Sequence, residues 1–421
     1  MRLRSIAAVL TLLAVACGCA SQTGPAGQPE IRALRGVRIY PAPDAPPIDD
    51  GVVLLRDGRI LSVGPRDAQS DRIPPLEAAC DGGVLMAGFQ NSHVHFIGDA
   101  FANAKSAPAA SLANALTQLL TQYGFTTAFD IASDRDNTLA LRERVNRGEL
   151  KGPRILTAGL PLFPHDGLPY YLKDRSPAFL ARLPQPDSVE AALATVRQNL
   201  DAGTDATKLF LATPQGRGIV KRMPDDIAAA AAAETHRRGK LVFAHPTDLD
   251  GIRAALRAKV DILAHPPLGT PGPWPTDLMA QVRTQGVSMI PTLKLLRYEL
   301  AKEHVPAEVA EGIVQDNVRE FGKFAAAGGQ VLFGTDVDYM SDSDPTEEYE
   351  LMARAGMSPM QILAALTTTP AARWNESERH GRIAPGMDAD IVVLAGDPGA
   401  ATKQFANVKC TVRGGTVIFA K

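Results

Sequence analysis

The chain has 421 residues, of which 45% are hydrophobic and 21% are charged. This length and composition indicate a globular protein that can bury the core of one large α/β domain together with a smaller one. Its 44 basic and 46 acidic residues give a formal net charge of -2, which offers no broad electrostatic attraction to nucleic acid or to an anionic membrane surface. Composition therefore excludes a polyanion-binding protein and leaves a small molecule as the expected partner.

Residues 1–20 have the pattern of an export signal, in which two arginines precede a short apolar run and then small residues. The run is too short to span a bilayer comfortably. Cys17, preceded by LAVA, and Cys19, preceded by VACG, each resemble the cysteine of a bacterial lipoprotein signal, while Ala20 would suit an ordinary signal peptidase. We therefore expect an exported protein of the bacterial periplasm or envelope, and we favour a lipid anchor at one of the two cysteines.

Both ends of the remaining chain carry short β-type runs. Residues 21–30 form a polar linker, and residues 31–85 then hold runs that are separated by Gly, Pro and Asp. Asp57-Gly58 predicts a hairpin, since these residues adopt the positive φ that a two-residue turn requires. Residues 376–421 have the same texture. Neither end is large enough to make a stable sheet alone, so we predict one small β-sandwich built from both.

Beyond residue 20, Cys80 and Cys410 are the only cysteines. They lie far apart in the sequence, and neither has a second cysteine at metal-ligand spacing. An oxidising compartment would allow a disulfide between them, although two free buried thiols are the interpretation that the sequence favours.

Residues 86–375 alternate between short apolar runs, such as KLVFAHP and DILAHPP, and helix-like segments, such as SVEAALATVRQNLDAG. Most of the helix-like segments end at glycine, as helix C-termini commonly do. Strand alternating with helix eight times predicts an α/β protein with a (β/α)8 barrel, inserted between the two parts of the sandwich. Such a barrel places its chemistry at the carboxyl ends of the strands.

Chemically active side chains fall at or near the carboxyl ends of five of these strands. In the first, an H-x-H sequence puts His93 and His95 on one face, because successive strand residues point to opposite sides. The other strands contribute Lys208, His245, His265 and Asp336. Each has an ordinary explanation when taken alone: a strand-ending histidine, an extended surface lysine or a helix-capping aspartate. Their occurrence in register on five strands instead predicts a site for a divalent metal such as Zn²⁺.

These residues resemble the amidohydrolase superfamily of metal-dependent hydrolases, which has H-x-H after the first barrel strand, Lys on the fourth, His on the fifth and sixth, and Asp on the eighth. TTTPAARW followed by GRIAPGMDADIVVL is similar to the C-terminal passage of its prolidase-like and imidazolonepropionase-like branch. The resemblance covers nearly all of the chain beyond the signal. It implies a barrel with a small sandwich outside it and a binuclear metal centre.

The resemblance also implies individual roles. One metal would be held by the H-x-H pair and Asp336, and the other by His245 and His265. Carbamylated Lys208 would bridge two Zn²⁺ ions, for which Mn²⁺, Co²⁺ or Fe²⁺ could substitute. Asp336 would also take the proton of the attacking water and pass it to the leaving group. The alternative is an unmodified Lys208 in a one-metal enzyme.

Two passages depart from the metal-dependent dipeptidases of this branch. Those enzymes usually show a Gly-rich tail after the lysine and Glu-His-Gly at strand six, where this chain has KLFLATPQG and LAHPPLG. The metal ligands remain, so the departures concern the substrate pocket. They weaken any transfer of dipeptidase specificity to this chain.

Loops beyond the strand ends supply the candidate substrate contacts. The loop after the third strand carries His165, which would meet the substrate or its oxyanion, and Tyr170. Lys294 follows strand seven and would receive a substrate carboxylate, while Asp338 belongs to an acidic segment that would contact a basic group. A surface histidine, a solvated helix face and a helix N-cap are the alternative explanations for these residues.

The predicted function is hydrolysis of the amide bond of a small dipeptide-like, N-acyl amino acid or cyclic amide substrate by metal-activated hydroxide. An ester, lactone or phosphotriester is the alternative substrate, because the same hydroxide attacks these bonds. A non-enzymatic envelope-binding lipoprotein is a third interpretation, and the retention of all six metal-type positions argues against it. The sequence allows a homo-oligomer without specifying one.

Overall fold

The computed structural model describes residues 30–216, 218–268, 270 and 272–421. The predicted signal peptide, with Cys17 and Cys19, and nearly all of the predicted linker lie outside the described residues. Residues 31–421 form one compact unit. Within the described part of the chain, no helix is both long enough and apolar enough to cross a membrane.

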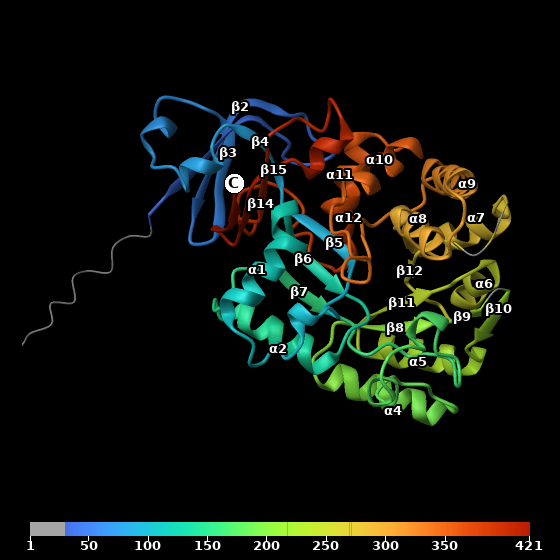
Figure 1. Ribbon diagram of the computed structural model, residues 1–421. Helices are drawn as coiled ribbons and strands as arrows, with labels where there is room; N and C mark the ends of the chain where they lie inside the picture. The colour runs from blue at the N-terminus through green and yellow to red at the C-terminus, as the bar shows by residue number, and fades with distance from the viewer. Residues whose placement is uncertain (1–29, 217, 269, 271) are drawn as a thin grey trace, which may run out of the picture. The chain divides into compact units, whose positions relative to one another are not determined.

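The two ends of this unit meet in one seven-stranded mixed sheet (Figure 1). Its strands in spatial order are β16 (Thr416–Ala420), β15 (Val408–Arg413), β14 (Ile391–Leu394), β4 (Gly83–Ala87), β1 (Arg32–Ile39), β2 (Ile48–Arg56) and β3 (Arg59–Pro65). The ends join where β4 pairs antiparallel with β14, and the blue and red ribbons lie side by side there. The prediction that both ends share one β unit is confirmed, but the unit is a single mixed sheet where a small sandwich was predicted.

The hairpin predicted at Asp57-Gly58 joins β2 to β3. The two residues have φ angles of 53° and 72°, which is the left-handed backbone of a tight two-residue turn. Apolar side chains from one face of the sheet then pack into a core of their own, which includes Leu34, Val53 and Ile391. The central strands β4 and β14 are buried along their whole length, as strands covered on both faces are.

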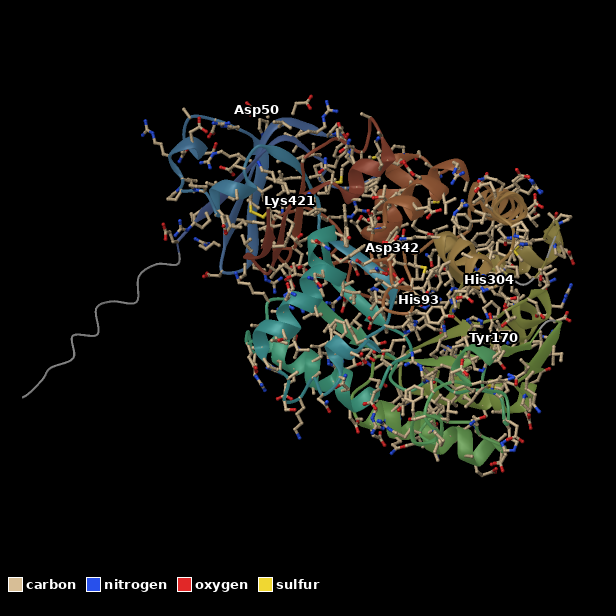
Figure 2. All side chains as sticks on the ribbon, viewed as in Figure 1. Asp50, His93, Tyr170, His304, Asp342 and Lys421 are labelled. Carbon is tan, nitrogen blue, oxygen red and sulfur yellow. A yellow bond between two sulfur atoms is a disulfide. The ribbon has the colours of Figure 1, made fainter. Side chains whose placement is uncertain are left out.

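Cys80 and Cys410 form a disulfide inside this core, where their Cα atoms lie 5.3 Å apart (Figure 2, yellow). The interpretation as two free thiols was therefore wrong. It relied on a sequence separation of 330 residues, which says nothing about distance once the chain ends share a sheet. The bond ties the segment before β4 to β15.

The middle of the chain contains two parallel sheets. One comprises β5 (Phe89–Val94), β6 (Phe125–Asp130) and β7 (Arg154–Thr157). The other comprises β8 (Ala206–Phe210), β11 (Leu241–His245), β12 (Ile262–Ala264) and β13 (Ser288–Ile290). A separate hairpin of β9 (Ala212–Gly216) and β10 (Ile219–Arg222) follows β8. All neighbouring strands within the three-stranded and the four-stranded sheet run parallel.

Helices alternate with these strands, which confirms the predicted α/β class. They are α1 (Ala109–Leu119), α2 (Arg135–Asn146), α3 (Pro177–Leu180), α4 (Val189–Asp201), α5 (Asp225–Arg237), α6 (Leu249–Arg257), α7 (Thr276–Thr284), α8 (Leu293–Lys302), α9 (Ala307–Ala326), α10 (Thr346–Arg354), α11 (Pro359–Leu366) and α12 (Thr368–Arg373). Asp134, Ser188 and Asp248 begin three of them by accepting a backbone N–H three residues later.

Isolated bridges connect the two parallel sheets. Leu162, which follows β7, bridges to Leu209 of β8, and Val331 bridges to Met289 of β13. The segment that contains Val331 also contacts β5, where the Ser92 N–H donates to the carbonyl of Phe333 at 2.8 Å. Residues 330–336 (QVLFGTD), which the sequence predicts as the eighth strand, are thus held between β13 and β5 by single bridges and hydrogen bonds.

Candidate metal centre

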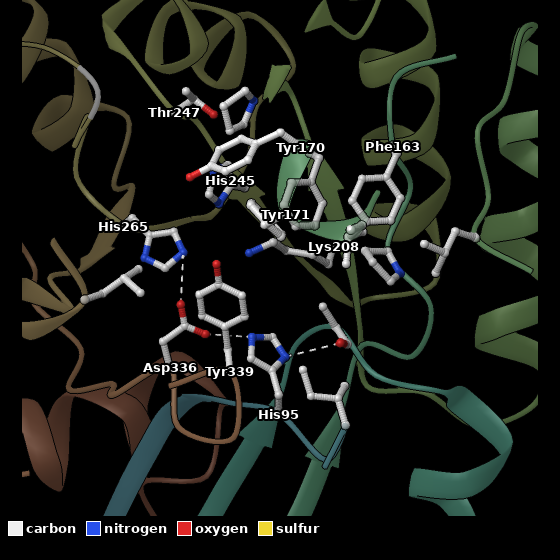
Figure 3. Close-up of a pocket in the computed structure, with 18 of the residues that line it drawn as sticks. His95, Phe163, Tyr170, Tyr171, Lys208, His245, Thr247, His265, Asp336 and Tyr339 are labelled. Carbon is white, nitrogen blue, oxygen red and sulfur yellow. Dashed lines mark hydrogen bonds and ion pairs between the residues drawn. The ribbon is translucent and has the colours of Figure 1, made fainter. Parts of the chain in front are cut away.

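The six predicted metal-binding side chains line one pocket of about 380 Å³ (Figure 3). They come from the carboxyl-end region of β5, from the middle of β8, from the last residue of β11, and from the residues just after β12 and the eighth segment: His93, His95, Lys208, His245, His265 and Asp336. Parallel strands present their carboxyl ends to the same edge of a sheet, which is why residues up to 243 positions apart converge here.

Asp336 lies at the middle of the group. Its Oδ1 is 2.8 Å from His95 Nε2 and 3.2 Å from His93 Nε2, and its Oδ2 is 3.8 Å from His265 Nε2. The His265 ring also lies 4.9 Å from the His245 ring, centre to centre. One carboxylate therefore faces three imidazoles, and the fourth imidazole stands behind them.

The backbone at this site departs from ordinary geometry. His265 and Asp336 have φ angles of 92° and 57°, in the left-handed region that residues other than glycine rarely adopt. Gly334 permits the close approach of the segment before Asp336, since a Cβ there would lie 2.7 Å from the Cβ of His93. Such strain persists only where the surrounding structure enforces it, and it often marks a functional site.

Burial governs the charge of these groups. It lowers the pKa of His93 to about 4 and that of His245 to about 3, and it brings the pKa of His265 well below its usual value. Burial also disfavours the charged form of His95, but the hydrogen bond and the charge of Asp336 raise the pKa of that ring overall. Neutral imidazoles with free lone pairs therefore dominate the site at neutral pH.

The donors present fit a divalent metal ion. Ligand atoms of His93, His265 and Asp336 lie within 4.8 Å of one another, and all three residues are buried. Among the described residues, Asp336 Oδ1 finds no hydrogen-bond partner that satisfies normal geometry, although imidazole nitrogens stand close to it. A cation between carboxylate and neutral imidazoles would satisfy these atoms, and nitrogen and oxygen donors of this kind suit Zn²⁺.

Lys208 projects into the same pocket. It is only 1% exposed, it makes no ion pair with any described residue, and its ammonium lies 5.3 Å from the ring centre of Phe210. Burial lowers its pKa to about 7, so a large fraction of the amine is neutral at neutral pH. The charge of Asp336 offsets only part of the effect of burial, so the ammonium form remains costly.

Residues behind the pocket hold the imidazole of His95 in place. His95 Nδ1 lies 3.2 Å from the carbonyl of Ala132 and 4.0 Å from Asp130 Oδ1. Asp130 is fully buried and accepts hydrogen bonds from three hydroxyls, those of Ser133, Thr138 and Thr157. Bonds to the outer ring nitrogen orient a metal-binding histidine and fix its tautomer.

The sequence analysis did not assign Asp130 or Thr292, whose hydroxyl lies 2.7 Å from His265 Nδ1. Each stands at the carboxyl end of a barrel-type segment, Asp130 as the last residue of β6 and Thr292 shortly after β13. The strand-end rule that found the metal ligands could therefore have found these two residues as well.

The rest of the pocket is mainly apolar and aromatic. Phe163 and Phe210 stack with ring centres 4.4 Å apart on one side. Tyr171 and Tyr339 form an edge contact at 5.4 Å on another side, and Figure 3 shows both near Asp336. The Tyr339 hydroxyl donates to a carboxylate of the pocket wall at 2.8 Å. The site can therefore enclose a small molecule with a substantial apolar part.

The four predicted substrate contacts fall in different places. Tyr170 lines the pocket, and its hydroxyl donates to Glu303 at 2.8 Å. His165 is not among the described pocket-lining residues; its side chain is 52% exposed. Lys294 instead donates to the carboxylate of Asp342 at 2.7 Å.

Asp338 also lies outside the described pocket lining. Its carboxylate accepts the backbone N–H groups of Ile97 and Gly98 at 2.7 and 2.8 Å. The loop after β5 is thereby tied to the residues that follow Asp336. Asp338 and Lys294 thus hold loops in the positions seen, and neither reaches the pocket.

An α/β fold with imidazoles, a lysine and a carboxylate gathered at strand ends defines a hydrolase of the metal-binding type. The sequence model of the Amidohydrolase family matches residues 84–418, so the chain belongs to this family and is an enzyme of the hydrolase class. A comparison with curated proteins finds no match.

Solved structures share the fold over nearly the whole chain. An Xaa-Pro dipeptidase with bound methionine in its active site has 18% sequence identity and a TM-score of 0.77, covering 93% of this chain and 100% of that one. An ochratoxinase from A. niger has 20% identity and a TM-score of 0.74, covering 93% and 96%. A molinate hydrolase has 19% identity and a TM-score of 0.73, covering 93% and 95%. At these identities the likeness is one of fold.

Proposed function

We propose that the protein is a metal-dependent hydrolase that cleaves the amide C–N bond of a small substrate. The observation that carries this proposal is the convergence of six metal-type side chains from five strand ends on one pocket. The H-x-H pair and Asp336 would hold one ion, and His245 and His265 the other. Zn²⁺ suits these donors best, and Mn²⁺, Co²⁺ or Fe²⁺ are compatible with them.

Asp336 is the proposed general base. A divalent metal, when bound, supplies Lewis acidity towards water and towards the substrate carbonyl. Burial alone would raise the pKa of Asp336, but the close imidazoles of His93 and His95 outweigh it and hold that pKa well below the usual value. The carboxylate therefore remains ionised at neutral pH and accepts the proton of the attacking water. The same group then delivers that proton to the nitrogen of the leaving amine.

Lys208 is proposed to carry a carbamate that bridges two ions. The neutral amine adds to CO₂ and loses one proton, which gives a carbamate anion in place of the amine. Its full burial supports this assignment, because the charge of Asp336 compensates the ammonium only in part, whereas a carboxylate would face the metal ions directly. A one-metal enzyme with unmodified Lys208 is the alternative.

The proposed substrate is a dipeptide-like, N-acyl amino acid or cyclic amide compound with an apolar group. The stacked Phe163 and Phe210 and the tyrosines at the opposite wall would pack against that group. The structural neighbours named above include a dipeptidase, an ochratoxinase and a molinate hydrolase, which supports hydrolysis of a C–N bond without choosing among these substrate classes.

A (β/α)8 barrel, closed through the bridges at Leu209 and Val331, would frame the pocket.

Export to the bacterial periplasm or envelope is part of the same proposal. The Cys80–Cys410 disulfide supports it, because disulfides persist in oxidising compartments. A lipid anchor at Cys17 or Cys19 would follow from the signal pattern of the sequence. Mass spectrometry of the mature N-terminus tests it: a lipidated cysteine supports an anchor, and an unmodified Ser21 excludes one.

The decisive experiment combines metal content with activity. Protein purified without chelator should contain about two metal ions per chain and show a mass gain of one CO₂ in native buffer. It should hydrolyse members of a panel of N-acyl amino acids, dipeptides and cyclic amides in preference to matched esters. Asp336→Asn should lower kcat/KM by at least about 100-fold, whereas Asp166→Asn, at an exposed loop carboxylate, should not.

Each outcome has a defined meaning. One ion without the mass gain would replace the bridged centre by the one-metal alternative. Faster turnover of the esters would replace the amide by the alternative bond class. Absence of metal and of hydrolysis on the whole panel would contradict the proposed function.

A further inference from the structure

Helix α8 begins without the help of its own N-cap side chain. Thr292 occupies the N-cap position, and its hydroxyl accepts no backbone hydrogen bond from the helix. A threonine at this position normally accepts the N–H of the second or third helical residue. Its backbone is also unusual, with φ 41° and ψ 48°, a left-handed conformation that is a genuine outlier for a β-branched residue.

Glu348 caps this helix from outside. It lies in the first turn of α10, is 1% exposed, and its two oxygens accept the N–H groups of Leu293 and Lys294 at 2.9 and 2.8 Å. These are the first two amides of α8, which have no partner within the helix. A carboxylate at a helix N-terminus is also favoured by the helix dipole. Thr292 is therefore not needed as a cap.

The hydroxyl of Thr292 is bonded to a predicted metal ligand instead. Its Oγ1 lies 2.7 Å from His265 Nδ1, and both side chains are buried. A neutral imidazole that donates from Nδ1 to Oγ1 has its lone pair on Nε2. That nitrogen is the one facing Asp336, at 3.8 Å. A hydroxyl can donate to Nδ1 as well as accept from it, and acceptance is the arrangement that leaves Nε2 available to a metal.

We propose that Glu348 and Thr292 act together as positioning residues: Glu348 caps α8 in place of Thr292, which leaves the threonine hydroxyl free to hold His265 in its metal-binding tautomer. If Glu348 were absent, the amides of Leu293 and Lys294 would lose their acceptor, and Thr292 is the residue at the N-cap position of the same helix. Thr292 would then rotate away from His265 to cap its own helix. This inference rests on the proposed metal-binding role of His265.

Matched substitutions at Thr292 test the first link. Thr292→Val keeps the branched shape and removes the hydroxyl, whereas Thr292→Ser keeps the hydroxyl. The dissociation constant for Zn²⁺, measured by competition with a chromophoric chelator, should rise by about tenfold or more in Thr292→Val. It should stay near the wild-type value in Thr292→Ser. Equal affinity in Thr292→Val and wild type would overturn the inference.

A double-mutant cycle tests the second link. Glu348→Ala should weaken Zn²⁺ binding to the same degree as Thr292→Val, because it redirects the hydroxyl to the helix. The double variant should then bind no more weakly than Thr292→Val alone. A loss equal to the product of the two single losses would show that Glu348 acts independently. Glu348→Gln retains one acceptor oxygen and the shape of the side chain, so its Zn²⁺ affinity should lie between those of wild type and Glu348→Ala. It replaces Glu348→Ala in the cycle if that variant does not fold.

A metal-free readout separates this inference from the proposed function. Nitrogen-15 NMR of histidine-labelled, metal-free protein should show His265 protonated at Nδ1 in wild type and in Thr292→Ser. In Thr292→Val and Glu348→Ala the proton should be shared between the two ring nitrogens. Unchanged tautomers in these variants would refute the positioning role, while failure of wild type to bind Zn²⁺ would instead count against the proposed function.

Discussion

Replacing Lys208 by methionine is expected to stabilise the metal-free protein. The lysine is 1% exposed and unpaired among the described residues, and burial lowers its pKa from 10.5 to about 7. The unfolded chain therefore holds the proton more tightly than the folded chain does, which costs stability wherever the unfolded lysine is charged. Methionine fills a similar space and has no charge to desolvate.

The size of the effect depends on pH in a defined way. The cost is complete below pH 7, declines as the pH rises, and vanishes above 10.5, where the lysine is neutral in both states. At about 1.4 kcal/mol per pH unit, the cost is about 4 kcal/mol at a pH of about 7.5 and about 1 kcal/mol at a pH of about 9.5. The gain from Lys208→Met should therefore shrink by about 3 kcal/mol between these two conditions.

Urea denaturation at the two pH values measures this difference, with metal chelated and CO₂ excluded so that the lysine stays unmodified. Lys294→Met is the matched control, because this lysine is also buried but donates to Asp342 and to the carbonyl of Asp344. It should lower the free energy of unfolding modestly, since it removes hydrogen bonds between α8 and the loop that carries Asp342 and Asp344. A Lys208→Met gain that is absent, or equal at both pH values, would refute the reasoning.

Three further changes have expected outcomes. Reduction of the Cys80–Cys410 bond should lower the free energy of unfolding by up to about 5 kcal/mol, because the intact bond closes a very long loop in the unfolded chain. A thermal transition unchanged by reductant would contradict this. Asp130→Asn should raise the Zn²⁺ dissociation constant about tenfold, because three hydroxyls and a metal-site histidine depend on its position; equal loss in Asp136→Asn, an exposed neighbour, would count against it. Phe210→Ala should raise KM for substrates with a bulky apolar group more than for small ones, and a uniform change in steady-state kinetics would rule out its packing role.

The metal-type residues could be found from sequence because one geometric rule governs them. Parallel strands bring their carboxyl ends to one edge, so a histidine such as His245 needs only a place at a strand end to reach the pocket. Loop residues obey no such rule. Tyr170 does line the pocket, yet His165 in the same loop is exposed and Lys294 is engaged by loop oxygens.

Local patterns along the chain determined the α/β class, the hairpin at Asp57-Gly58 and the set of candidate ligands. These features depend on periodicity and on conformational preferences that each residue carries with it. The disulfide between Cys80 and Cys410, and the capping of α8 by Glu348 with its consequence for Thr292, were decided only by the tertiary structure. Both join segments that the sequence holds far apart, and their distances follow from how sheets and helices pack.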